Sequence, residues 1–200
     1  MEIPQIVTLL TQLDVNKPCR TKATILQYRG GGGCGAWDCK AEDGFWYVVK
    51  YQNNPQDRPY GLPWKVLTTE LICSRLGQLF VPPVCPSASI IDIPNELASV
   101  VVSPNGEHPS SGPSFGSRSV EEVIETKAGG FINLVSPEQV ARVIVFQTWL
   151  GGDDTAALVS LDGSGKIFLS IDHGWYLTGS QWNESILLAQ PSVSLVLLPQ

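Results

Sequence analysis

Charged residues are scarce in this chain of 200 residues, since they make up 16% of it against roughly 25% in an average domain. This scarcity argues against a coiled coil or a disordered protein, because both classes are rich in charge. The 13 Lys and Arg are outnumbered by 19 Asp and Glu, which gives a net charge of −6. An acidic chain without a clustered basic face is not expected to bind nucleic acid.

Long apolar runs are also missing from the sequence. No stretch of 18 consecutive apolar residues occurs, so we expect neither a transmembrane helix nor a membrane partner. The opening MEIPQIVTLLTQLD has no basic segment and no small-residue cleavage site, which predicts a cytoplasmic protein. Thiols stay reduced in the cytoplasm and the five Cys form no C-x-x-C pair, so we expect neither disulfides nor a zinc site.

What the sequence does contain is an alternation of short strands and helices. Hydrophobic patterns and turn residues predict strands at 21–28, 45–51, 87–92, 156–161 and 166–171, and helices at 63–80 and 136–150. The first two strands are expected to form an antiparallel hairpin around a Gly-rich segment. The Pro- and Gly-rich stretch 104–119 is expected to be an exposed connection. This order of strands and helices favours an α+β fold.

Five polar features are candidates for chemistry. They are the Gly-rich segment with Gly31, Gly32 and Gly33, Lys50 at the end of FWYVVK, Glu70 in TTELI, Asp153 and Asp154 in WLGGDD, and Asp172 at the end of IFLSID. Taken singly, most of them also fit structural roles: a flexible hairpin loop, a solvent-exposed lysine, a surface glutamate and an acidic turn. Asp172 differs, because a carboxylate at the mouth of a buried strand is unusual unless it is paired or binds metal.

The order of these features along the chain is the stronger signal. A Gly-rich loop, a strand Lys, a helix Glu, a loop Asp and a strand-end Asp follow one another in this order in protein kinases. In that chemistry the loop covers phosphates, while Lys50 holds the α- and β-phosphates and pairs with Glu70. Asp153 would accept the hydroxyl proton, and Asp172 would hold Mg²⁺. The order therefore predicts ATP and Mg²⁺ as cofactors and a hydroxyl group as the acceptor.

At these positions the sequence resembles the HipA-like kinases, in particular the short bacterial stand-alone HipA-like domains. The resemblance rests on YVVKY (47–51), TTELICSRLG (68–77), GPSFGSR (112–118), VFQTWLGGDD (145–154) and LSIDHGWYL (169–177). It implies a bilobal protein-kinase-like fold. An antiparallel-sheet N-lobe would cover residues 1–110, and a reduced, mostly helical C-lobe would cover residues 111–200.

The resemblance also implies a role for each matching residue. Lys50 matches the ATP lysine and Glu70 its helix partner. Asp153 matches the catalytic aspartate, with Asp154 as the alternative, and Asp172 matches the metal ligand. Because the best-known members are toxins of toxin–antitoxin systems, an antitoxin-like protein is a further expected partner.

Two features of the sequence keep alternatives open. GPSFGSR falls where a kinase hinge would lie, so Ser117 or Arg118 could touch nucleotide phosphate, but an ordinary ordered loop suits the segment equally. Where the family's catalytic loop reaches an Asn that helps hold metal, this chain has Ala156 and Ala157. Three hypotheses follow: a kinase that phosphorylates a protein Ser or Thr or a small-molecule hydroxyl, a pseudokinase that binds nucleotide or a partner without turnover, and an interaction domain with coincidental motifs.

Overall fold

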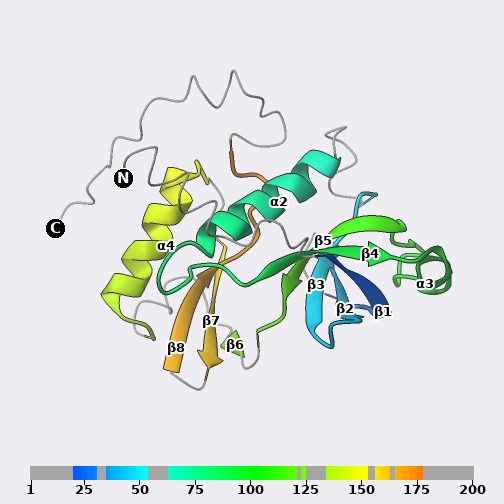
Figure 1. The fold of residues 1–200 in the computed structure, drawn as a ribbon, viewed down its shortest axis with the longest axis horizontal. Coiled ribbons are helices and arrows are strands. Elements are labelled where there is room, and N and C mark those ends of the chain that lie inside the picture. The colour runs from blue at the N-terminus through cyan, green and yellow to red at the C-terminus, as the bar shows by residue number, and fades with distance from the viewer. Residues whose placement is uncertain are drawn as a thin grey trace.

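The computed structural model describes residues 20–30, 35–53, 63–120, 123–124, 134–152, 156–162 and 165–177. They form a mixed α/β structure in which two sheets lie side by side, with helix α2 crossing above both in the view of Figure 1. The strands are β1 (Arg20–Tyr28), β2 (Trp37–Ala41), β3 (Trp46–Lys50), β4 (Ala88–Ile93), β5 (Gly112–Arg118), β6 (Val123–Ile124), β7 (Ala157–Asp162) and β8 (Gly165–Ser170). The helices are α2 (Pro63–Gly77), α3 (Asn95–Val100) and α4 (Pro137–Trp149).

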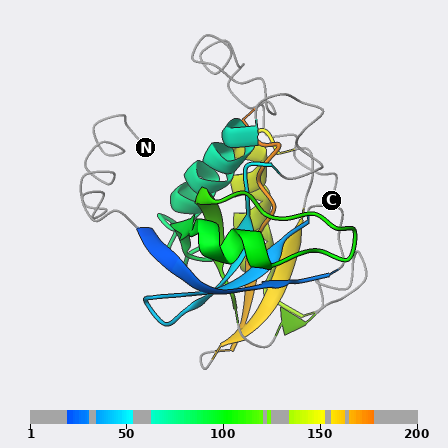
Figure 2. The ribbon, with the colours of Figure 1, turned by 90° about the vertical axis from the view of Figure 1, so that its right-hand side faces the viewer.

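The first five strands close into a barrel in the order β1-β2-β3-β5-β4. Neighbouring strands are antiparallel except at the seam between β1 and β4, where the strands run parallel and Arg20 pairs with Ile90. Figure 2 looks onto the barrel and shows α3 in front of the strands. Ala98 of α3 is buried in the barrel core, so this short helix covers the barrel on the side away from the second sheet.

Strand β2 corrects the predicted hairpin. It lies between β1 and β3 and pairs with both, so the expectation that 21–28 and 45–51 pair directly is wrong. Trp37, Cys39 and Ala41 of β2 are buried, and the residues between them are half-buried. This is the period-two pattern of a strand, but it spans only five residues beside a Gly-rich segment.

Strand β5 corrects the predicted connection at 104–119, because residues 112–118 form the strand between β3 and β4. Its Gly and Pro content suggested a loop, but Gly116 serves close packing: a Cβ there would clash with the side chain of Ile91. The pairing of β5 places it in the barrel, whereas the predicted lobe boundary at residue 110 would separate it from β1–β4. The division into lobes stays a prediction.

Side chains along β3 alternate between the barrel interior and the face toward the second sheet. Tyr47 and Val49 are buried in the barrel core, whereas Val48 and Lys50 lie on the opposite face and are half-buried. The outward-facing Lys50 is thereby carried on a strand whose other face is fixed by core packing.

The second sheet has the order β6-β7-β8 and packs against α4. Helix α4 begins as predicted, because the Ser136 side chain caps it by accepting a hydrogen bond from the backbone N–H of Gln139. Its apolar face, with Val143 and Phe146, packs on Val159 and Phe168. In the described ranges this half holds one helix and three strands, so they do not bear out a mostly helical second lobe.

None of the helices in the described ranges has the length and apolar character of a membrane-spanning segment.

Candidate functional site

A cavity of about 260 Å³ lies where the barrel, α2 and the second sheet meet. One part of its lining is apolar: Ala36, Val48, Pro86, Phe115, Val120, Leu158 and Ile171. The other part is polar or charged: Arg29, Lys50, Glu70, Ser74, Ser117, Arg118, Ser119, Ser170, Asp172 and His173. The cavity therefore joins an apolar wall to a charged one, as small-molecule sites commonly do.

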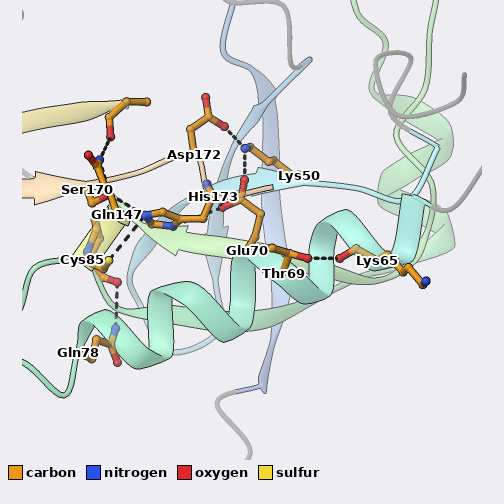
Figure 3. A network of polar contacts seen from close by, with 12 residues as sticks. Lys50, Lys65, Thr69, Glu70, Gln78, Cys85, Gln147, Ser170, Asp172 and His173 are labelled. Carbon is orange, nitrogen blue, oxygen red and sulfur yellow. Dashed lines mark hydrogen bonds and ion pairs between the residues drawn. The ribbon is translucent and has the colours of Figure 1, made fainter. Parts of the chain in front are cut away.

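Lys50 is the centre of the charged wall. Its ammonium group forms ion pairs with Oε1 of Glu70 and with Oδ1 of Asp172, so three segments far apart in the chain meet at one nitrogen (Figure 3). Burial alone lowers the pKa of Lys50, but the two carboxylates outweigh burial and hold that pKa above its ordinary value. Lys50 is therefore a fixed positive charge at neutral pH.

Glu70 is the inner partner of Lys50, with a side chain that is only 1% exposed. One carboxylate oxygen pairs with Lys50, and the other, Oε2, accepts a hydrogen bond of 2.9 Å from the backbone N–H of His173. A buried carboxylate is tolerated only when it is paired and hydrogen-bonded, and Glu70 meets both conditions. Through these two contacts, Glu70 of α2 links Lys50 of β3 and the backbone of His173 after β8 to the helix.

Asp172 is the outer partner, and its side chain is 37% exposed. It follows β8 with a φ of 65°, in the left-handed region that Asp tolerates better than most residues. Two positions later, a Cβ on Gly174 would lie 2.7 Å from Cγ1 of Val66 and 3.4 Å from Oε1 of Glu70. The glycine of the IDHG motif thus lets this turn approach α2 closely enough for Asp172 to reach Lys50.

His173 lies behind the charged triad and is almost fully buried. Burial is the largest influence on its pKa, which is lowered to about 4 even though the nearby carboxylates of Glu70 and Asp172 raise it. Its ring is therefore neutral at pH 7. The ring also packs edge-on against Phe146 and Tyr176, which fixes its plane.

Two further buried polar residues continue inward from His173. Nε2 of His173 lies 2.9 Å from Oγ of Ser170, and the side-chain amide of Gln147 donates a hydrogen bond of 2.9 Å to the same oxygen (Figure 3). The sequence prediction missed both Ser170 and Gln147. The only sequence signal for Gln147 is a polar residue beside Phe146 on the buried face of α4, and nothing local marks Ser170 as its partner.

The two predicted residues of β5 separate onto different faces of the strand. Ser117 lies opposite Val48 in the register, so it shares the face of Lys50 and lines the cavity. Arg118 lies at the cavity edge, and its guanidinium carbon stands 3.4 Å from the centre of the Phe45 ring. Ser117 is therefore better placed than Arg118 to meet a group bound beside Lys50.

The remaining predicted site residues lie outside the described ranges. These are Gly31, Gly32 and Gly33 in the Gly-rich segment and Asp153 and Asp154 after α4. Residues that flank the Gly-rich segment are described: Arg29 and Ala36 both line the cavity, and the backbone N–H of Arg29 donates to the carbonyl oxygen of Ala36 at 3.4 Å. The segment that joins β1 to β2 thus starts and ends at this cavity.

A search of curated proteins finds no match for the chain. A family model described as HipA-like kinase matches residues 23–163, well over half of the chain. The matched region runs from β1 to the end of β7 and includes Lys50 and Glu70. This chain therefore belongs to the HipA-like kinase family.

Proposed function

We propose that this protein is an ATP-dependent kinase that transfers the γ-phosphate to a Ser or Thr hydroxyl of a protein or to a small-molecule hydroxyl. The observation that carries the proposal is the convergence of Lys50, Glu70 and Asp172 at one cavity. A strand lysine held by a helix glutamate beside a strand-end aspartate is the arrangement with which protein kinases hold nucleotide phosphates. Membership of the HipA-like kinase family supports the same chemistry.

The cavity suits a nucleotide because its two walls differ. Val48, Phe115 and Ile171 offer apolar surface for a planar base, and Lys50 supplies a fixed positive charge for phosphate oxygens. Ser117 adds a hydroxyl on the same face of the barrel. The Gly-rich segment between Arg29 and Ala36 would cover the phosphates, since glycine allows backbone N–H groups to approach them closely.

The residues present also fit Mg²⁺ bound together with a nucleotide. Mg²⁺ usually keeps several waters and is held by one or two carboxylates plus substrate phosphates. Within the described ranges no three His, Cys, Asp or Glu residues gather as a complete metal site, but Asp172 places a half-exposed carboxylate at the cavity. When bound, Mg²⁺ would neutralise charge that develops on the phosphate oxygens.

The protein's own side chains would then divide the work. Lys50 orients the α- and β-phosphates, Glu70 keeps Lys50 in position, and Asp172 holds the metal. Asp153, or Asp154 in its place, accepts the proton of the attacking hydroxyl.

In this proposal the barrel and α2 form the nucleotide-binding lobe of a protein-kinase-like fold, and the lobe boundary falls after β5 instead of at residue 110. A cytoplasmic location and an antitoxin-like partner belong to the same proposal.

A pseudokinase is the second candidate function. Ala156 and Ala157 stand where the family's catalytic loop reaches a metal-binding Asn, so one metal ligand is replaced by a methyl group. Such a protein would bind nucleotide through Lys50 and Asp172 without transferring phosphate.

A thermal-shift titration with MgATP tests nucleotide binding. At 100 times its Kd a ligand stabilises the folded state by about 2.7 kcal/mol, so wild-type protein should show a clear rise in Tm. Lys50→Met should abolish that rise. Lys166→Met is the matched control, because Lys166 is exposed on β8 and does not line the cavity. No shift in the wild type would refute both the kinase and the pseudokinase.

Transfer from γ-labelled ATP separates the two candidates. A kinase labels itself or an added protein substrate, or hydrolyses ATP slowly, and loses this activity in Asp172→Asn and Asp153→Asn. Binding without transfer or hydrolysis supports the pseudokinase.

A further inference from the structure

The hydrogen bonds around His173 determine which ring nitrogen carries its proton. Two groups that can donate stand near Nε2: the Ser170 hydroxyl at 2.9 Å and the Cys85 thiol at 3.8 Å. Ser170 already accepts a hydrogen bond from Gln147, which leaves its own proton free to point at Nε2. Burial raises the pKa of Cys85, so its thiol keeps its proton. Nε2 can therefore act as an acceptor in both contacts.

The other ring nitrogen faces the opposite kind of group. Nδ1 of His173 is buried and makes no hydrogen bond within the described residues, but it stands 3.8 Å from Oε2 of Glu70, a carboxylate oxygen that can only accept. A lone pair on Nδ1 would face this negative charge, whereas an N–H would be attracted to it. The carboxylate beside Nδ1 thus favours the tautomer with its proton on Nδ1, and the Gln147–Ser170 pair is compatible with that tautomer.

We propose that His173 is a positioning residue of this site: its backbone N–H holds the inner oxygen of Glu70 at 2.9 Å, and its ring, as the tautomer protonated on Nδ1, attracts the same oxygen from 3.8 Å, so that the outer oxygen stays on Lys50. The role rests on the kinase function proposed above, in which Lys50 meets the phosphates. Gln147 of α4 and Ser170 of β8 take part in the same hydrogen-bonded group and orient the ring.

Packing alone does not account for this arrangement. The edge-on contacts of His173 with Phe146 and Tyr176 would suit a phenylalanine equally well. A buried imidazole with buried Ser and Gln partners costs free energy unless its polar atoms are used. Ser170 meets Nε2, and Nδ1, which makes no hydrogen bond within the described residues, faces the carboxylate of Glu70, so the ring lies between Gln147 of α4 and the Lys50–Glu70 pair.

Nitrogen NMR of the histidine rings tests the tautomer without reference to kinase activity. The chain has two histidines, His108 and His173, and the signals lost in His173→Phe identify the buried ring. Long-range proton–nitrogen spectra of the full chain at pH 7 should show a protonated Nδ1 and an unprotonated Nε2. Ser170→Ala should shift the Nε2 resonance or mix the two tautomers. A proton on Nε2 in the wild type would overturn the proposal.

Kinetics with MgATP test the consequence for Lys50. His173→Phe keeps the ring packing and the backbone N–H but removes the ring N–H, and it should raise the KM for ATP about tenfold, equal to about 1.4 kcal/mol. His173→Asn places an amide N–H near the position of Nδ1 and should recover part of this loss. A merely structural defect would reduce the amount of active protein, which lowers kcat and leaves KM unchanged. His108→Asn, a change at an exposed histidine, is the control.

The outcomes separate the two proposals. Failure of the wild type to bind MgATP overturns the kinase function, and the positioning role with it, before any variant is made. A pseudokinase is tested in the same way, with the Kd of MgATP in place of KM. If the wild type binds or turns over ATP and folded His173→Phe keeps the same KM or Kd, only the positioning role is overturned.

Discussion

The inside of the barrel and the layer behind the cavity are built on different principles. The barrel core is filled mainly by apolar side chains, among them Trp37, Val49 and Ile91. The layer between α4 and β8 buries a hydrogen-bonded group, Gln147 and Ser170, that reaches His173. Apolar packing fixes a strand without regard to charge, whereas hydrogen bonds fix the direction of individual atoms. The barrel therefore presents Lys50, and the polar layer sets how Lys50 is held.

The largest effect on stability is expected inside the barrel. Ile91 is fully buried and packs over Gly116, so Ile91→Ala leaves a cavity and should lower the free energy of unfolding by about 2–5 kcal/mol. Urea denaturation followed by tryptophan fluorescence measures this loss. The Kd of MgATP for the folded protein should not change, because Ile91 faces the barrel interior.

Ile91→Val serves as the control for that variant, with an expected loss of about 0.5–1.5 kcal/mol. Equal losses for the Ala and Val variants would contradict the view of the barrel as a tightly packed scaffold.

The polar layer should be the more sensitive half to acid. The pKa of His173 in the folded protein is about 4, below its ordinary 6.5, so between these values the unfolded chain binds a proton that the folded chain does not. Stability is therefore full above pH 6.5 and falls as the pH drops towards 4, by about 1–3 kcal/mol from this residue. The charged groups that face the ring are Glu70, Lys50 and Asp172.

Chemical denaturation of wild type and His173→Phe across pH 4–7 measures that contribution. The difference in unfolding free energy between the two proteins should change with pH over this range. A difference independent of pH would show that the folded protein accepts the proton on His173 as readily as the unfolded chain.

The smallest effect on stability is expected at the cavity mouth. Asp172 is half-exposed and Lys50 keeps Glu70 as a second partner, so Asp172→Asn should lower the unfolding free energy by only about 1 kcal/mol. The same substitution should remove most of the thermal stabilisation by MgATP. A loss of several kcal/mol in the absence of nucleotide would instead make Asp172 a structural residue.

The parts of this molecule that could be predicted from the sequence are those with a local signal. The capped helix α4 and the pair β7–β8 have such signals in Ser136 and in the sequence DGSG at 162–165. The pairing of Lys50 with Glu70 was predicted from their order along the chain together with a family resemblance, whereas Asp172 was predicted only as a metal ligand and its ion pair with Lys50 was not foreseen.

The parts that could not be predicted depend on contacts across the fold. The sequence of β5 predicts a loop because glycine weakens an isolated strand. Gly116 fits the strand only because the side chain of Ile91 packs against it and leaves no room for a Cβ. The link from Gln147 to His173 joins residues 26 positions apart through Ser170, and no local pattern encodes such a partnership. Hydrogen-bond partners of this kind become visible only in three dimensions.

The position of β5 also has a consequence for the way the chain folds. Closure of the barrel requires β4 to return to β1, with Arg20 beside Ile90, and β5 to enter between β3 and β4. Pairings between distant segments form slowly because loop-closure entropy is lost before the contacts form. A growing chain that has not yet reached Arg118 carries β3 and β4 as unpaired edges, which are prone to join other chains. The barrel can thus close only after β5 has been made, and the cavity beside it forms later still, once β8 and Asp172 have followed.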